Sequence, residues 1–219
     1  MGMGNIRDKM ARRAALEIED RMVVNLGIGI PSLVPNHIDE KLNVMIQAEN
    51  GILGIGPTPS HGTEDENLCN AGGLPVTTMS GTSYFDSSIA FGMIRRGYVD
   101  ITILGALQVS EKGDLANWIV PGKRVPGMGG AMELAQKAKK VIVVMSHCNK
   151  NGESKIVETC SLPLTSQACV DMIITDMAVM KVTPTGLVLT EVMAPFTPEE
   201  VIAQTTANLT IATDLSTFL

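Results

Sequence analysis

A short apolar strand runs into an acidic turn in the stretch Asn43-Val44-Met45-Ile46-Gln47-Ala48-Glu49-Asn50-Gly51. The β-branched and apolar residues at 43–46 predict a buried strand, and Gly51 marks the turn that follows it. In parallel α/β sheets, the crevice beyond the strand ends is where ligands bind. The stretch therefore predicts an α/β fold with Glu49 at the edge of the sheet.

Glu49 at such a position is suited to covalent catalysis. A glutamate carboxylate that is not deeply buried is ionised at neutral pH, so it needs no partner base to act as a nucleophile. Gly51 removes a side chain beside it, which would let a bulky substrate approach the backbone. The alternative is an Asx-type turn in which Glu49 faces solvent, and these residues alone leave both interpretations open. Glu191, a second acid at a strand end, is expected at the surface.

Helices and strands alternate along most of the chain, which predicts a mostly parallel mixed sheet flanked by helices. No Pro/Ser-rich or charge-rich linker divides the 219 residues, so we expect a single domain over 1–219. Residues 54–73 are rich in Gly, Pro, Asn and Ser and predict a long functional loop. The expected helices are 6–22, the segment after a turn at 27–32 up to about 40, 86–96, 131–140 and 197–204; the expected strands are 23–26, the one ending at Glu49, 99–104, 141–145, 170–175, 178–182 and 187–192, the last two as a hairpin around 184–186.

The charge balance argues against some partners and for others. The net charge is −6, the sequence pI is near 5.1 and there is no basic stripe, so neither nucleic-acid nor anionic-membrane binding is expected. Charged residues make up 18% of the chain, below the ~25% usual for soluble domains. A chain with little charge has less polar surface to show to water. We therefore expect part of its surface to be an interface in an obligate oligomer.

The sequence lacks the features of a secreted, membrane or metal-binding protein. No apolar run approaches the ~18 residues of a membrane span, and residues 1–10 lack the apolar core of a signal peptide. The four cysteines form no C-x-x-C pair and are expected to be reduced thiols, and the adjacent His147 and Cys148 are expected to be neighbours by chance. These features predict a cytoplasmic protein without a metal site.

The first of two Gly-rich turns is Gly27-Ile28-Gly29-Ile30-Pro31. A strand precedes it and a helix is expected after it, so free backbone N–H groups could face an anion. The third glycine of a dinucleotide loop is missing, and Pro31 has no N–H. The turn is therefore weak evidence for NAD and better evidence for a backbone-lined ligand loop.

The second Gly-rich turn, Gly127-Met128-Gly129-Gly130, also precedes an expected helix. The backbone amides of Gly129, Gly130 and Ala131 would sit at a helix start, where they suit an oxyanion or a phosphate. Lys123 adds positive charge nearby. A tight turn with solvated cations explains the same residues equally well.

Six motifs in order along the chain resemble one family closely. They are Asn25-Leu-Gly-Ile-Gly-Ile-Pro, Glu49-Asn-Gly, Phe85-Asp-Ser-Ser, Leu104-Gly-Ala-Leu-Gln-Val, Gly113-Asp-Leu-Ala-Asn-Trp and Gly127-Met-Gly-Gly-Ala-Met. Together they resemble the β (B) subunit of family I coenzyme A transferases, of the 3-oxoacid and acetate/butyrate–acetoacetate CoA-transferase type. The resemblance runs from about Met3 to the last expected helix. It implies the CoA-transferase fold, which is similar to that of ribose-phosphate isomerase.

The resemblance implies that Glu49 is the nucleophile of a ping-pong CoA transfer that passes through a glutamyl–CoA thioester. It implies no permanently bound cofactor, because CoA and acyl-CoA are substrates. It also implies an α (A) subunit as partner, in a heterodimer or heterotetramer, since 219 residues can hold only the β half. The residues expected to bind CoA or to stabilise the oxyanion are Gly27, Ile28, Gly29, Ile30, Pro31, Asn50, Gly51, Asn117, Lys123, Gly127, Gly129, Gly130 and Ala131.

The chain departs from the family pattern at two positions. Ala48 stands where the family usually has Ser, and Pro126 where close relatives often have a basic residue. The first concerns the tuning of Glu49 and the second the phosphate contacts. A thioester hydrolase using Glu49, and a non-catalytic ligand-binding domain of the same fold, remain alternatives because fold does not fix function.

Overall fold

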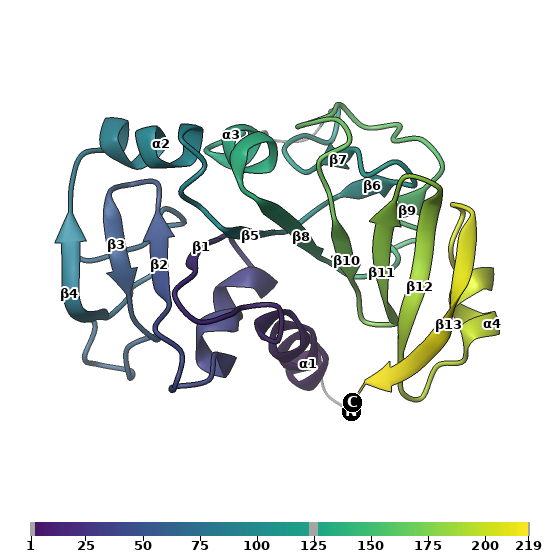
Figure 1. Ribbon diagram of the computed structural model, residues 1–219, viewed down its shortest axis with the longest axis horizontal. Coiled ribbons are helices and arrows are strands. Elements are labelled where there is room, and N and C mark those ends of the chain that lie inside the picture. Colours follow the sequence, from purple (N-terminus) through teal and green to yellow (C-terminus); the bar gives the residue numbers. More distant parts are fainter. Residues whose placement is uncertain (1–2, 123–126, 219) are drawn as a thin grey trace.

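The computed structural model describes residues 3–122 and 127–218 of the chain. Parallel strands form the middle of a ten-stranded sheet, in the order β13-β12-β11-β10-β8-β5-β1-β2-β3-β4 (Figure 1). Each of these central strands is a short and largely buried apolar run, as expected of strands covered on both faces. The parallel strands are β1 (Val23–Leu26), β2 (Met45–Ala48), β5 (Ile101–Leu104), β8 (Lys140–Val144) and β10 (Met172–Ile174).

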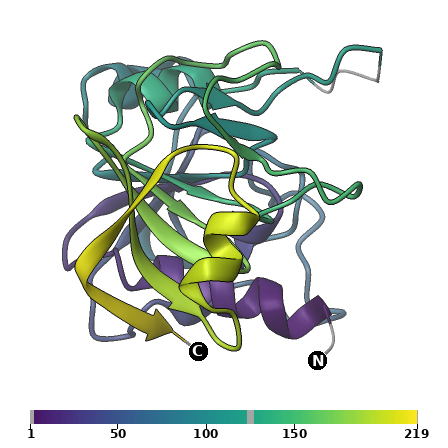
Figure 2. The same cartoon turned by 90° about the vertical axis from the view of Figure 1, so that its right-hand side faces the viewer.

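Antiparallel strands extend the sheet on both sides, so the predicted mixed α/β fold is confirmed. One margin consists of β3 (Ile52–Ile55) and β4 (Thr78–Tyr84). The other consists of β11 (Ala178–Thr183) and β12 (Gly186–Met193), which form the predicted hairpin, and of β13 (Leu209–Phe218), which runs parallel to β12. Figure 2 views the molecule from this second margin. The strands β3, β4 and β13 were not expected from the sequence.

Helices cover both faces of the central strands (Figure 1). The helix α1 (Met3–Ala15) and the 3-10 helix η1 (Ile30–His37) pack together on one face. The helices α2 (Ser87–Arg95) and α3 (Ala131–Lys137) lie on the other, beside a small sheet of β6 (Gln108–Ser110), β7 (Leu115–Ala116) and β9 (Ile156–Val157). The helix α4 (Pro198–Ala203) begins with a capping box, in which the Thr197 hydroxyl accepts from the Glu200 N–H.

Three helix boundaries differ from the prediction. The first helix ends at Ala15, not near residue 22, although Ile18 continues the apolar spacing and is buried in the same core. The segment after the first Gly-rich turn is a 3-10 helix because Pro35 lies inside it and provides no N–H for a regular α-helical bond. The helix that begins at Ala131 ends at Lys137, since Lys140 already pairs in β8.

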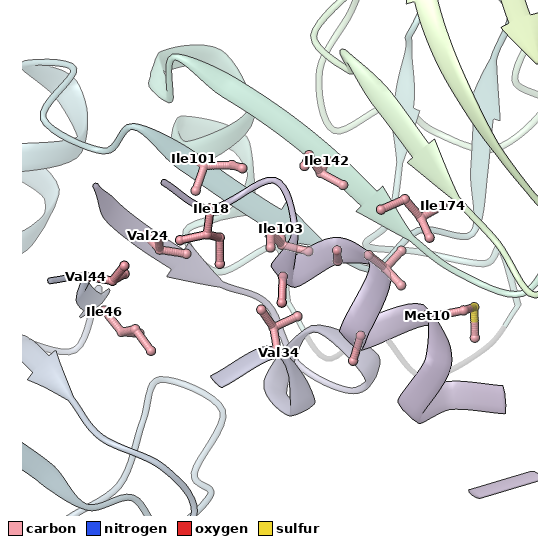
Figure 3. Packing of buried hydrophobic residues seen from close by; sticks show 14 of the residues in the cluster. Met10, Ile18, Val24, Val34, Val44, Ile46, Ile101, Ile103, Ile142 and Ile174 are labelled. Atoms are coloured by element: carbon pink, nitrogen blue, oxygen red, sulfur yellow. The ribbon is translucent and has the colours of Figure 1, made fainter. Parts of the chain in front are cut away.

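Alternating residues of the central strands fill two separate cores. Along β8, Ile142 and Val144 point into the core under α1 and η1, whereas Val141 and Val143 point into the core under α3. Figure 3 shows the first of these cores, in which Ile18 lies near Val24 and Ile103, and Met10 of α1 lies at the end of the cluster toward Ile174. Such two-sided burial fixes the strand register, because a shift of one residue would exchange the two faces.

A network of ion pairs attaches α1 to the sheet. Arg13 donates to both carboxylate oxygens of Glu191 and, at 2.7 Å, to Glu17, and Lys140 Nζ lies 2.6 Å from Glu17. Glu191 is therefore a partly buried partner of Arg13, contrary to the surface position expected from the sequence. Burial raises the pKa of Glu17. The hydrogen bonds and charges of Lys140 and Arg13 together lower it by more, so the pKa lies below the ordinary 4.5.

We predict that this network makes the stability of the fold depend on pH in the acidic range. A carboxyl with a lowered pKa in the folded state stabilises the protein above the unfolded pKa, and this stability is lost as the pH falls from about 4.5 through the folded value. Replacing Glu17 by Gln is expected to lower the unfolding free energy at pH 7 by roughly 2 kcal/mol. Thermal unfolding from pH 7 to pH 3 checks this. The difference in Tm between the variant and the unmodified chain should shrink as the pH falls, and a constant difference would contradict the argument.

Membrane-spanning helices and metal-binding clusters are not found among the described residues. None of their helices is long and apolar enough to cross a membrane. They also contain no group of three or more His, Cys, Asp or Glu residues placed to hold a metal ion. His147 is buried, and its two ring nitrogens lie 3.1 Å and 2.9 Å from the hydroxyls of Thr175 and Thr205. Burial lowers the His147 pKa to about 4, which describes a neutral structural histidine.

Candidate active site

A cleft of about 480 Å³ opens at the edge of the sheet where the central strands end. Its walls come from the loops after β1, β2 and β5 and from the turn before α3. These segments meet because the strands are parallel, so that their carboxyl ends share one edge, and because α3 starts at that edge before leading into β8. The lining residues are 25–28, 49, 71, 72, 104–107, 117, 127–131 and 134.

Glu49 lies at the start of the tight connection between β2 and β3. Ala48 pairs with Ile52 across this hairpin, and the Gly51 N–H donates to the Ala48 carbonyl at 3.0 Å. The side chain of Glu49 is half-buried. Among the described residues that line the cleft, Glu49 is the only charged one. The prediction that the strand end carries a carboxylate to a crevice at the sheet edge is thereby confirmed.

A buried amide holds one oxygen of the Glu49 carboxylate. Asn25, only 1% exposed at the end of β1, donates from Nδ2 to Glu49 Oε2 at 3.2 Å and to Gln47 Oε1 at 2.7 Å. A hydrogen bond to an ionised group is stronger than one between neutral groups. The carboxylate therefore has a preferred direction, toward the cleft side of β1.

The other oxygen of the carboxylate packs against the second Gly-rich turn. A Cβ atom built on Gly130 would lie only 3.0 Å from Glu49 Oε1 and 3.2 Å from its carboxyl carbon. Within the described parts of the chain, the N–H groups of Gly129 and Gly130 have no hydrogen-bond acceptor. Backbone N–H groups of this turn therefore lie near the carboxylate, and donors of this kind can stabilise a negatively charged oxygen.

We predict that Gly130→Ala impairs the site without impairing the fold. The backbone at Gly130 is right-handed helical (φ −79°, ψ −4°), which alanine adopts freely, so the added methyl group acts only by displacing the Glu49 carboxylate. A shift of a few tenths of an ångström at a reacting atom is expected to lower kcat/KM roughly 10-fold for the CoA transfer that the sequence motifs imply. Gly92→Ala in α2 is the control, because its new Cβ meets nothing within 4 Å. Equal activity of the two variants would show that the contact between Gly130 and Glu49 has no role.

The structure brings only part of the first Gly-rich turn to the cleft. Gly27 and Ile28 line it, and Ile28 is 69% exposed there. Gly29 lies outside the lining residues, and Ile30 and Pro31 begin η1, where they are half-buried and buried. Of this turn, the prediction of a ligand loop therefore applies to its first two residues.

Asn117 lines the cleft, but its amide is used within the protein. Its Nδ2 donates to the Gly105 carbonyl at 3.2 Å, and its Oδ1 accepts from the Thr165 hydroxyl at 2.6 Å. Asn117 therefore fixes the wall that follows β5. Gly127, Gly129, Gly130 and Ala131 all line the cleft as expected, whereas Lys123 lies outside the described residues.

Asn50 and Gly51 lie next to Glu49 in the sequence but outside the cleft. The exposed Asn50 side chain donates to the Cys69 carbonyl at 2.9 Å. Gly51 has a φ of 115°, and a Cβ atom there would lie 1.8 Å from the Phe85 carbonyl oxygen. The close neighbour of Gly51 is thus the protein backbone and not a substrate, which corrects the expectation from the sequence.

Several cleft residues were not singled out from the sequence. Asn25 is the last residue but one of β1, and Glu49 directly follows β2, so the same strand-end argument would have identified Asn25. Gly105 and Ala106 follow β5 in the same way. Ala71 and Gly72 come from the long loop 54–73, where no periodic pattern predicts which residues turn toward the sheet.

Known proteins resemble this chain over almost its full length. A family profile described as Coenzyme A transferase matches residues 7–204. The beta chain of a probable coenzyme A transferase of Bacillus subtilis is 59% identical over 96% of this chain and 98% of its own. The B chain of the succinyl-CoA:3-ketoacid coenzyme A transferase of Helicobacter pylori is 46% identical over 94% of this chain and 99% of its own.

A solved structure supports the same assignment of the fold. An acyl-CoA transferase of Escherichia coli O157:H7, in a thioester complex with CoA, superposes with a TM-score of 0.76 at 20% identity. The match covers 97% of this chain but 43% of that one, so this chain spans less than half of that longer protein. Fold, family profile and relatives agree: the chain belongs to the coenzyme A transferase family.

Proposed function

We propose that this chain is the catalytic β subunit of a CoA-transferase that moves CoA between an acyl-CoA and a short-chain or 3-oxo carboxylic acid such as acetoacetate. The observation that carries the proposal is the placement of Glu49. It is the charged group among the described lining residues, held by Asn25 and packed on the Gly130 turn. Relatives named for succinyl-CoA:3-ketoacid and acetate transfer support this class of acid.

The proposed chemistry needs only the Glu49 carboxylate and the two substrates. The carboxylate attacks the thioester carbonyl of the acyl-CoA, the carbon–sulfur bond breaks, and an acyl-glutamyl anhydride and CoA thiolate result. The thiolate then attacks the glutamyl carbonyl, which forms a glutamyl–CoA thioester and releases the first carboxylate. A second carboxylate repeats the two steps in reverse and leaves as its CoA thioester. One thioester replaces another, so no proton, ATP or redox partner is consumed.

Several features of the cleft support this sequence of steps. Each attack places negative charge on a carbonyl oxygen, and we expect the N–H groups of Gly129 and Gly130 to stabilise it, because their turn lies against Glu49. Losing one well-aimed donor of this kind costs roughly 3 kcal/mol of transition-state stabilisation. Gly27, Ile28 and the wall fixed by Asn117 leave room for the pantetheine arm. Binding energy from such remote parts of CoA can lower the barriers to the anhydrides.

We also propose an α subunit as the partner of this chain. The names of the similar Bacillus subtilis and Helicobacter pylori proteins describe them as the beta and B subunits of their enzymes. The mitochondrial succinyl-CoA:3-ketoacid coenzyme A transferase 2A of Rattus norvegicus matches this chain over only 41% of its own length, at 48% identity. A separate α subunit would supply the counterpart of the remaining length.

Covalent trapping tests the proposal. The chain, co-expressed with its α partner, is mixed with acyl-CoA without an acceptor acid, treated with borohydride and analysed by peptide mass spectrometry. Borohydride reduces a glutamyl–CoA thioester to an alcohol, so the peptide that contains Glu49 should lose about 14 Da. No change at Glu49 in a folded complex that binds CoA would overturn the proposal.

A second arm of the same experiment separates transfer from hydrolysis. With an acceptor acid present, a transferase yields a new acyl-CoA and little free thiol, whereas a hydrolase yields free CoA whether or not the acid is added. Chromatography of the CoA products, together with a thiol assay, measures both. Free CoA as the main product would favour the hydrolase.

A further inference from the structure

A row of polar side chains crosses the apolar centre of the sheet. Thr102 on β5 is in register with Asn25 on β1, which is in register with Gln47 on β2. The three residues are at most 1% exposed, and their neighbours along each strand are apolar. Burying polar side chains among apolar ones costs free energy unless hydrogen bonds compensate. The pattern of hydrogen bonds within this row is therefore informative.

All the hydrogen bonds of the Asn25 amide run toward β2. Its Nδ2 lies 2.7 Å from Gln47 Oε1, 3.2 Å from the Gln47 carbonyl and 3.2 Å from Glu49 Oε2. Its Oδ1, buried on the opposite side of the amide, has no partner among the described residues, and neither has the Thr102 hydroxyl. The Nδ2 group of Asn25 therefore has three acceptors on the side of β2, and Gln47 Oε1 is the nearest of them.

This orientation of the amide is the one that the nucleophile requires. If the Asn25 side chain turned over, its Oδ1 would face both the Gln47 side-chain oxygen and the Glu49 carboxylate, and oxygen would oppose oxygen. The short bond to Gln47 Oε1 therefore keeps an N–H, and not an oxygen, toward Glu49. Gln47 is itself oriented from the helix layer, since its Nε2 lies 3.4 Å from the Ala90 carbonyl of α2.

We infer that Gln47 is a positioning residue, which acts through Asn25 to hold the Glu49 carboxylate in its attacking direction. The inference rests on the proposed function, because it assumes that Glu49 reacts. Gln47 makes no direct contact with the carboxylate in this set of bonds, so its effect should appear in the chemical step and not in CoA binding. Glu49 is the acidic residue of this set; Asn25, Ala90 and Thr102 carry no charge.

The first test removes the side-chain oxygen of Gln47. Gln47→Met keeps the length of the side chain and removes both polar atoms. Formation of the glutamyl–CoA thioester is followed in single turnovers by quench and mass spectrometry, alongside steady-state kinetics, with the α/β complex. We expect the rate of thioester formation and kcat to fall roughly 10- to 100-fold, because the carboxylate loses its fixed direction. The KM for acyl-CoA should change less than about threefold, since KM follows substrate binding when chemistry is slow.

Thr102→Val is the matched control. It alters the same buried row with the same loss of polarity, but Thr102 has no hydrogen bond to Asn25. The variant should retain kcat within about twofold, because residues that share no hydrogen-bond partner are only weakly coupled. A fall in kcat equal to that of Gln47→Met would mean that the row is only a packing feature, and would overturn the inference.

The second test uses charge in place of deletion and stays informative if Gln47→Met folds poorly. Gln47→Glu keeps an acceptor oxygen at the same distance while the new carboxyl is protonated, and adds a negative charge beside Glu49 once it ionises. Burial and the charge of Glu49 both raise the pKa of such a carboxyl. Activity of this variant should therefore approach the unmodified level at low pH and fall as the pH rises, unlike that of the unmodified enzyme. Parallel pH profiles at full activity would overturn the inference.

These results distinguish the inference from the proposed function. If the unmodified Glu49 forms no thioester, the proposed function fails first. If Glu49 reacts, and reacts equally fast in Gln47→Met, the proposed function stands and the positioning role of Gln47 is wrong.

Discussion

Replacing Glu49 by Gln is expected to lower kcat for CoA transfer by about 10⁴-fold or more, because loss of a covalent nucleophile removes the whole reaction route. The amide has nearly the size of the carboxylate but does not attack a thioester. The other lining residues are mostly glycines and apolar residues, together with Asn25 and Asn117, and the change leaves all of them in place. CoA should therefore bind with nearly unchanged affinity. Steady-state transfer assays and calorimetric titration with CoA measure the two quantities separately.

Glu49→Asp tests the position of the carboxylate and not its chemistry. The carboxylate retracts by about one bond length from its place beside the Asn25 amide and the Gly130 turn, and kcat should fall on the order of 10²-fold. Glu49→Ala is the companion control, since the Gln variant can regain activity by slow deamidation and the Ala variant cannot. Near-normal rates from any of these variants would show that Glu49 is not the nucleophile.

The position of Glu49 could be predicted because it depends on local signals. Short apolar strands that alternate with helices indicate parallel pairing, and the carboxyl ends of parallel strands share one edge. Glu49, Gly27 and the Gly127–Gly130 turn all stand at such ends or at the start of the next helix. These signals therefore predicted that Glu49 and residues of both Gly-rich turns belong to one cleft.

The errors concern features that depend on distant residues. The strand β4 is largely exposed and reads Thr-Met-Ser-Gly-Thr-Ser-Tyr, without the apolar alternation that signals a strand, and it exists because its backbone pairs with β3. The first helix was predicted to be too long because Ile18, which lies beyond the helix end, is also buried. Apolar periodicity alone does not distinguish a buried turn from a continued helix. Gly51 was expected to leave space for a substrate, because nothing in the neighbouring sequence reveals that its backbone packs against Phe85.

The approach of Gly51 to Phe85 leads to the largest expected effect on folding. Gly51→Ala is expected to lower the unfolding free energy by about 4 kcal/mol, which is exceptional for one methyl group. At a φ of 115° an L side chain is strained, and the new Cβ would lie 1.8 Å from the Phe85 carbonyl oxygen, inside any contact distance. Neither group can move alone, because the Phe85 N–H donates to the Gly51 carbonyl at 3.0 Å and Asp86 caps α2 immediately afterwards. Urea unfolding of the purified chain measures the loss.

Gly186→Ala separates the two causes of this loss. Gly186 has a φ of 116°, nearly that of Gly51, but a Cβ there meets nothing within 4 Å. Its cost should therefore be backbone strain alone, about 1–2 kcal/mol. The difference between the two variants is the cost of separating the β2–β3 hairpin from the chain segment that leads into α2. Equal losses at the two positions would show that the backbone at Phe85 gives way easily, and that Glu49 stands on a more pliable hairpin than the packing at Gly51 indicates.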